Sequence, residues 1–275
     1  MILVIIFWII ALCVNGSITY FTGIYNLWYW DLIMVALLPI TYLLVVGIYI
    51  AIVAFISLFF YSDKEITKPK PISAFFIKQS FRVIMGLSFI RVKRTGMENV
   101  PNDTKFLIIS NHKSNFDPFP ISYYFKGNIA NVSKPSNLKM PVYGNFIKRC
   151  GYISMPRDDD FAAVKSIVKA ANFIKNQITS VVIFPEGTRN KTEDPILEFK
   201  SGSFKIATKA KCPIVAVSLA NTDEIHKRWP FKPTTVYMDV VGVYKYEDYK
   251  DMNTQELSSM IQEKIKEKYL ERTKA

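Results

Sequence analysis

The sequence predicts an α/β domain with a mixed, largely parallel sheet flanked by helices, preceded by a transmembrane helical hairpin. Two observations support this fold class. The apolar residues are concentrated at the start of the chain, and the remainder alternates short β-like runs with longer helical runs. We expect a membrane anchor of two helices at 1–61, a linker with an amphipathic interfacial helix at 62–87, and a folded domain at 88–275.

The first 61 residues read as a membrane anchor. They contain no Lys or Arg, and Asp31 is their only acidic residue. The run 32–61 is uncharged and longer than the roughly 18 residues that mark a transmembrane helix. The run 1–20 is just long enough to span, and its rival, a signal peptide, lacks the expected basic start. Basic residues follow residue 61 closely, so the positive-inside rule predicts that both termini and the domain are cytoplasmic.

The segment 72–87 has apolar residues at helical spacing, with Lys78 and Arg82 four residues apart on a basic face. A helix lying on the lipid headgroups fits this pattern. A helix packed on the core of the domain fits it equally well, so both interpretations stay open.

Seven β-like runs and four longer helical runs follow in the domain. In the helical run that begins at residue 158, apolar residues recur every three or four positions, which predicts one buried stripe. The stripe consists of Phe161, Val164, Val168, Ala171 and Ile174. The expected strands are 89–92, 106–110, 129–132, 152–155, 180–184, 214–219 and 235–243, and the expected helices are 114–125, 158–174, 201–210 and 254–270.

Charge and cysteine content restrict the class of protein. All 35 Lys and Arg residues lie in 62–275, which favours an anionic partner. The apolar start favours a membrane surface or a phosphorylated lipid over nucleic acid, which we do not expect as a partner. Cys13, Cys150 and Cys212 show neither paired nor metal-binding spacing, so we expect no disulfide framework and no metal site.

The segment 111–117 directly follows an expected buried strand, where α/β folds often place their chemistry. His112 can take up a proton near neutral pH, and Asp117 can curl back to orient its ring if a turn leads into a helix. Ser114 is a weaker candidate nucleophile, because the strained G-x-S-x-G turn is absent. A capping histidine and an ordinary turn aspartate remain the alternative for the pair taken alone.

The segment 184–189, with the sequence F-P-E-G-T-R, also follows an expected strand end. Gly187 permits close backbone approach to a ligand, and Arg189 offers a planar fork for phosphate oxygens. Glu186 can accept hydrogen bonds from substrate hydroxyls. A tight turn with a solvated ion pair is the alternative. The second histidine, His226, lies in a polar connection and reads as a surface residue.

Together these segments resemble the 1-acyl-sn-glycerol-3-phosphate acyltransferases. That family carries N-H-x-x-x-x-D, G-x-I-x-x-x-R and F-P-E-G-T-R blocks and a proline-containing strand, which match 111–117, 151–157, 184–189 and 212–217 in this order. The resemblance implies a glycerol-3-phosphate acyltransferase-like fold with a catalytic domain at 88–275. Pro156 stands where the second block usually has Asp, and Ala216 where the fourth usually has a second Pro.

The resemblance also implies roles for individual residues. His112 would be the general base and Asp117 its orienting partner. Arg157 and Arg189 would bind the acceptor phosphate, and Lys200 would extend this anionic site. The full implied substrate-binding set is Arg157, Glu186, Gly187, Thr188, Arg189 and Lys200.

The expected reaction transfers a fatty acyl chain from a thioester to the sn-2 hydroxyl of lysophosphatidic acid, forming phosphatidic acid in phospholipid biosynthesis. The donor would be acyl-CoA or acyl carrier protein, with no further cofactor, and membrane lipids would be partners. The alternatives are an acyltransferase or transacylase acting on another lysolipid, a lipid hydrolase, and a non-enzymatic lipid-binding protein of the membrane surface.

Overall fold

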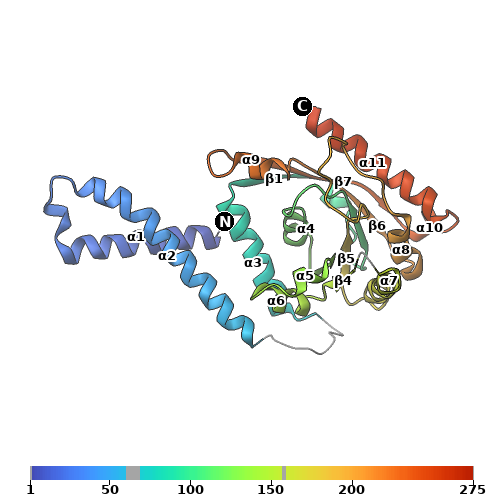
Figure 1. Ribbon diagram of the computed structural model, residues 1–275, viewed down its shortest axis with the longest axis horizontal. Helices are drawn as coiled ribbons and strands as arrows, with labels where there is room; N and C mark the ends of the chain where they lie inside the picture. Colours follow the sequence, from blue (N-terminus) through green and yellow to red (C-terminus); the bar gives the residue numbers. More distant parts are fainter. Residues whose placement is uncertain (1, 60–68, 157–158, 275) are drawn as a thin grey trace. The chain divides into compact units, whose positions relative to one another are not determined.

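The computed structural model describes residues 2–59, 69–156 and 159–274 (Figure 1). The chain divides into two compact units, residues 1–61 and 62–275, and each is considered by itself.

The first unit is a helical hairpin. Helix α1 (Ile2–Thr22) and helix α2 (Trp30–Leu58) are both long and apolar enough to cross a membrane, as the sequence predicts. The Asn15 amide donates hydrogen bonds to Ala11 O at 2.8 Å and to Thr41 Oγ1 at 2.5 Å. Asn15 is fully buried, and these bonds satisfy the N–H groups of its side chain where the two helices meet.

The second unit begins with α3 (Pro71–Leu87), which packs against α4 (Pro118–Tyr124) and α6 (Tyr143–Arg149). Lys78 Nζ donates to Phe125 O at 2.8 Å, and Arg82 donates to the Tyr123 hydroxyl at 2.6 Å. The basic face expected to meet lipid is therefore turned toward α4 and the residue that follows it. These contacts support the interpretation that the helix packs on the domain. Ile72 and Phe75 on the same helix are nevertheless exposed.

A seven-stranded sheet forms the centre of the second unit, in the order β1-β7-β6-β2-β5-β3-β4. The five strands from β6 to β4 are mutually parallel, whereas β7 pairs antiparallel with β6 and parallel with β1. This arrangement confirms the predicted fold class. The strands are β1 Ile90–Thr95, β2 Leu107–Ser110, β3 Ile129–Ser133, β4 Ile153–Ser154, β5 Ser180–Ile183, β6 Ile214–Ala220 and β7 Thr234–Tyr244.

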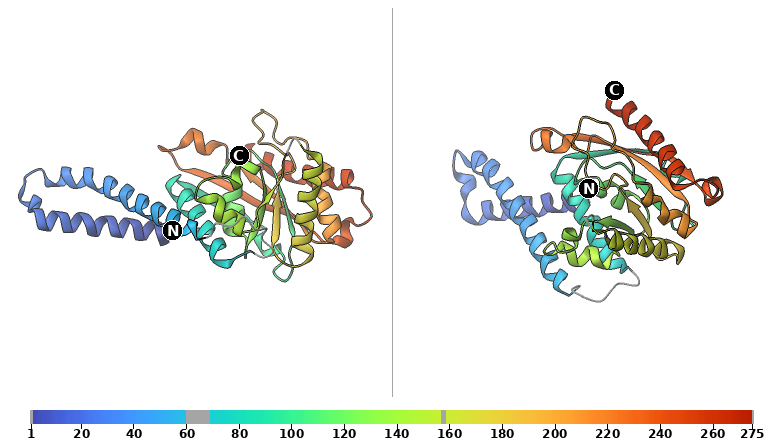
Figure 2. Two further views of the ribbon diagram at one scale, coloured as in Figure 1. Left: turned by 60° about the horizontal axis from the view of Figure 1, so that its bottom comes forward. Right: turned by 45° about the vertical axis from the view of Figure 1, so that its right-hand side comes forward.

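Helices cover both faces of the sheet (Figure 2). Successive side chains of a strand point to opposite faces, so Leu107 and Ile109 pack with one cluster of core residues and Ile108 with the other. The first face carries α7 (Asp160–Lys175), α8 (Lys205–Ala210) and α11 (Thr254–Lys274), and the second carries α4, with α3 packed beyond it. The short helices are α5 Pro135–Leu138, α9 Glu224–Arg228 and α10 Tyr246–Tyr249, with 3₁₀ turns at Ile24–Asn26, Met97–Asn99 and Ser201–Phe204.

The buried stripe predicted for α7 is wrong for three of its five residues. Phe161 is 70%, Val164 56% and Val168 38% exposed, whereas Ser166 and Ala170 are buried. The Ser166 hydroxyl donates to Ser154 O at 2.6 Å, so small residues set the helix against β4. The predicted helix is observed, but its contact face consists of small side chains in its first part and of Phe173 and Ile174 at its end.

Removing a core aromatic ring from α3 tests its packing. Phe81 is 1% exposed and stacks on Phe119 with ring centroids 4.4 Å apart. We expect Phe81→Ala to lower the free energy of unfolding by roughly 3–5 kcal/mol, because it leaves a cavity. Phe75→Ala, on the same helix but 55% exposed, is the matched control. Denaturant titration in detergent measures both, and equal losses would show that α3 is not packed as described.

Candidate active site

The register of two neighbouring strands brings the two sequence motifs together. In the parallel pair of β2 and β5, Ile109 lies opposite Ile183. His112 and Glu186 each come three residues later, so both emerge at the carboxyl edge of the sheet at the same level. The backbone N–H of His112 donates to Glu186 Oε1 at 2.6 Å.

His112 and Asp117 form a hydrogen-bonded pair. Nδ1 of the imidazole lies 2.7 Å from Asp117 Oδ2, which also accepts the backbone N–H groups of Lys113 and Ser114 at 2.8 Å each. The His112 ring stacks on Phe184 with centroids 4.4 Å apart. The imidazole is thus fixed from two sides, and Nε2 makes no hydrogen bond to any residue whose position is described.

A tight turn makes this pair possible. The sequence predicts a helix from residue 114, but α4 begins at Pro118, which occupies the first helical position. Proline is favoured there because its missing N–H would have no helical partner. Residues 111–117 therefore remain a turn whose backbone N–H groups converge on the fully buried Asp117.

Glu186 holds backbone segments together. Its Oε1 accepts from His112 N, and its Oε2 accepts from Leu197 N at 3.1 Å. The side chain is 4% exposed, and burial raises its pKa to about 7 although both hydrogen bonds oppose that shift. This geometry gives Glu186 a positioning role, and the substrate contact expected for it stays a prediction.

The last two residues of F-P-E-G-T-R face solvent. Thr188 and Arg189 are exposed, and the Arg189 side chain has no hydrogen-bond or ion-pair partner among the residues that the structure describes. Gly187 has a φ of +68°, and a Cβ there would lie 3.2 Å from Lys200 Cε and Nζ. Lys200 therefore lies directly beside Gly187. Both cationic residues predicted to bind phosphate here, Arg189 and Lys200, thus belong to one loop.

Two asparagines missed by the sequence analysis also fix the site. The Asn111 side chain donates to Leu219 O and accepts from Leu219 N, both at 2.8 Å, and so joins the end of β2 to β6. Asn190 N–H donates to His112 O at 2.7 Å. Arg189 is the neighbour of Asn190 in the chain, so its backbone lies close to that of His112. An asparagine directly after a buried strand was the available signal for Asn111.

Other candidates are placed as follows. Arg157 lies outside the described residues, so its phosphate-binding role stays a prediction. The Ser114 hydroxyl accepts from Phe116 N at 3.3 Å and has no hydrogen bond to His112, which gives no support to a serine nucleophile. His226 is exposed, as predicted, and its ring lies 5.2 Å from that of Phe116. All three cysteines are free, and the described residues contain no cluster of side chains suited to a metal ion.

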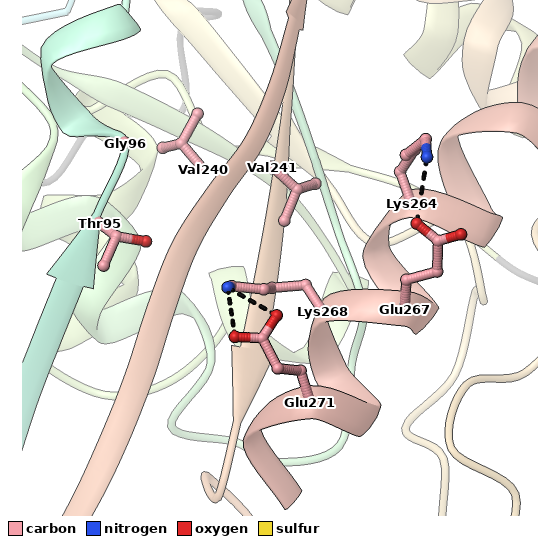
Figure 3. A pocket seen from close by; sticks show the side chains of 8 residues that line it. All are labelled: Thr95, Gly96, Val240, Val241, Lys264, Glu267, Lys268 and Glu271. Atoms are coloured by element: carbon pink, nitrogen blue, oxygen red, sulfur yellow. Dashed lines mark hydrogen bonds and ion pairs between the residues drawn. The ribbon is translucent and has the colours of Figure 1, made fainter.

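A shallow depression elsewhere on the domain does not involve these residues (Figure 3). It lies between β1, β7 and α11, with Lys264 paired to Glu267 and Lys268 to Glu271 in its wall. Strand β6 separates it from β2 in the sheet. Its cations are neutralised locally, so it offers no unpaired charge for an anionic ligand.

Comparison with known proteins identifies the class to which this fold and site belong. Residues 91–220 match the Acyltransferase family. The 1-acyl-sn-glycerol-3-phosphate acyltransferase of Borreliella burgdorferi is 31% identical over 202 residues, covering 72% of this chain and 79% of the relative. The enzyme of the same name from Helicobacter pylori is 32% identical over 165 residues, covering 60% and 68% of the two chains.

A solved structure has the same fold. The crystal structure of the 1-acyl-sn-glycerophosphate acyltransferase PlsC from Thermotoga maritima superposes with a TM-score of 0.63 at 26% identity, covering 82% of this chain and 89% of PlsC. The fold and the paired His112 and Asp117 thus define an acyltransferase. More specifically, the chain belongs to the 1-acyl-sn-glycerol-3-phosphate acyltransferase family.

The raised pKa of Glu186 predicts a pH-dependent stability. A carboxyl group with a folded pKa of about 7 and an ordinary value of 4.5 binds protons more tightly when folded. Its contribution to the free energy of unfolding is therefore greatest below the ordinary value. It falls by roughly 3 kcal/mol as the pH rises to 7, and is constant above that. Denaturant titrations of wild type and Glu186→Gln from pH 4.5 to 8 measure this contribution as the difference between their free energies of unfolding. A difference that does not change with pH would contradict the raised pKa of Glu186.

Proposed function

We propose that this enzyme transfers a fatty acyl chain from an acyl thioester to the sn-2 hydroxyl of lysophosphatidic acid, forming phosphatidic acid. The hydrogen-bonded pair of His112 and Asp117, whose turn is bonded to the loop that carries Arg189, is the observation that carries the proposal. Family membership adds support, because the related enzymes from several organisms are named for this acceptor. It also disfavours the alternative of a non-enzymatic lipid-binding protein.

His112 acts as the general base in this reaction. Because Nδ1–H donates to Asp117, the lone pair of Nε2 is free to accept the proton of the acceptor hydroxyl. The resulting oxygen attacks the thioester carbonyl carbon, the C–S bond breaks, and the imidazolium returns the proton to the departing thiolate. Asp117 orients the ring throughout and stabilises its positive charge. Neither a metal ion nor a cofactor beyond the thioester carrier enters this scheme.

Arg189 and Lys200 bind the phosphate of the acceptor. Both are exposed, and both lie on the loop whose backbone contacts His112 through Asn190. A guanidinium fork matches phosphate oxygens in two hydrogen bonds, and the ammonium adds a nearby charge. Gly187 and Thr188 would line the glycerol between phosphate and imidazole, and Arg157 would complete the anionic site.

The membrane keeps both acyl substrates within reach of the domain. We place the domain on the cytoplasmic face, because the basic residues follow α2 directly in the chain. The thioester donor is acyl-CoA or acyl carrier protein, and an assay with each donor in turn distinguishes them.

Replacing the general base tests the chemistry. We expect His112→Ala to lower kcat/KM for lysophosphatidic acid by roughly 10²- to 10⁴-fold, the usual contribution of general base catalysis. His226→Gln, at the other histidine of the chain, should retain activity. Initial rates with purified full-length enzyme measure both. Full activity in His112→Ala would refute the mechanism, and thioester hydrolysis independent of lysolipid would indicate a hydrolase.

Replacing Arg189 tests which headgroup is bound. A hydrogen bond to a charged group contributes about 1.5–3 kcal/mol, so Arg189→Ala should raise KM for lysophosphatidic acid roughly ten-fold or more. Lysophosphatidylcholine, whose phosphate diester carries less negative charge, should be a poorer substrate and less affected. Lys209→Ala on α8 removes an exposed charge elsewhere and is the control. Equal use of both lysolipids by wild type would contradict the proposed acceptor and favour a broader remodelling enzyme.

A further inference from the structure

The segment between α9 and β7 presents aromatic rings to solvent. Trp229 is 52% and Phe231 90% exposed, and Phe89, at the end of α3, is 51% exposed. Figure 1 shows this segment, coloured orange, beside the start of β1 at the edge of the domain. Large apolar rings gathered at one place on a surface mark a contact with another apolar phase or with a partner.

Hydrogen bonds hold these rings in place. Trp229 Nε1 donates to Leu87 O at 3.0 Å, and Phe231 N and Lys232 N donate to Arg228 O at 3.1 and 2.9 Å. Thr234 N donates to Phe89 O at 3.1 Å, which brings Phe89 next to the segment. The rings are therefore presented by an ordered turn joined to the end of α3.

Basic side chains flank the rings. Lys227 and Arg228 are exposed and both pair with Glu224, at 2.7 and 3.8 Å, and the charge of Asp223 also acts on Lys227, so these two cations are largely neutralised. Lys232 is exposed and has no ion-pair partner within the part of the chain that the structure describes. Aromatic rings with adjacent cations match the headgroup layer of an anionic bilayer, where rings enter the interface and cations meet phosphate.

The apolar helices of the same chain favour a bilayer as the partner of this segment. The same chain carries α1 and α2, both long and apolar enough to cross a membrane. A tether raises the effective concentration of the second contact, so even a weak interaction becomes populated. An acidic protein that bound the same residues would have to compete with the bilayer to which the chain is tethered.

The segment lies next to the active site. Strand β6 runs parallel to β2, so α9, which follows β6, starts at the same carboxyl edge of the sheet as His112. The ring of His226 in α9 lies 5.2 Å from that of Phe116, in the turn that carries the catalytic pair. Contact of this segment with lipid would bring the site to the membrane surface.

We propose that residues 227–232, together with Phe89, form a second membrane contact that docks the catalytic domain on anionic lipid headgroups. Phe231 and Trp229 enter the interface, and Lys232 binds lipid phosphate. This contact is separate from the two apolar helices and does not depend on which lysolipid is the acceptor.

A fluorescent label at position 231 tests the contact in the full-length protein. Burial raises the pKa of the Cys150 and Cys212 thiols to about 12, so in a Cys13→Ser background an environment-sensitive NBD label reacts with the engineered site alone. The labelled Phe231→Cys protein is placed in nanodiscs of phosphatidylcholine and phosphatidylglycerol containing a lipid with a shallow doxyl quencher. A blue-shifted emission that is lost with the quencher is the expected result. Phe161→Cys, at a position 70% exposed on α7, is the matched control and should stay water-like.

Charge reversal tests the role of Lys232. One lysine near an anionic surface contributes a factor of about five, so Lys232→Glu should lower the ratio of docked to undocked label by at least about that factor. Lys266→Glu reverses the charge of another exposed lysine, on α11, and should leave this ratio unchanged. Quenching at 231 no stronger than at 161 would overturn the proposal, as would equal effects of the two charge reversals. Both readouts are independent of turnover, so they separate failure of this contact from failure of the proposed reaction.

Discussion

The parallel pairing of β2 with β5 is the constraint on which the rest of the site depends. With Ile109 opposite Ile183, two polar turns leave the sheet at the same level. The carboxylate of Glu186 then bridges them by accepting the backbone N–H of His112. A slip of β2 by one residue would turn its side chains to the opposite face of the sheet, and the imidazole of His112 would lose its place beside Glu186.

Three buried polar side chains in this site hold backbone, whereas two cationic side chains beside them stay exposed. Asn111, Glu186 and Asn190 are each at most 4% exposed and have their hydrogen bonds within the protein. Arg189 and Lys200 are exposed on the same loop. Because an unpaired buried charge is costly, cations that must wait for an anionic substrate are better kept at the solvent edge. The depression near α11 illustrates the contrast, since its cations already have carboxylate partners.

Much of this arrangement was predictable from the sequence, for definite physical reasons. Six of the seven strands were expected within one residue of their observed ends, because strands buried in a sheet are runs of apolar, often β-branched residues, whereas the mostly exposed β1 ends three residues later than expected. Polar residues after two such runs located the site. Helices α5, α6, α9 and α10 were missed because four to seven residues carry too little periodicity. The inward orientation of Glu186 depends on strand register and on Leu197, which no local pattern encodes.

The tautomer of His112 is the most direct test of the central claim that Asp117 orients it. The chain has two histidines, so His226→Gln leaves a single imidazole for ¹⁵N labelling and NMR. In the neutral imidazole, a protonated Nδ1 and an unprotonated Nε2 are expected, with Asp117→Asn shifting the proton toward Nε2. A wild-type ring protonated at Nε2, or one unaffected by Asp117→Asn, would contradict the pairing and the general base role that rests on it.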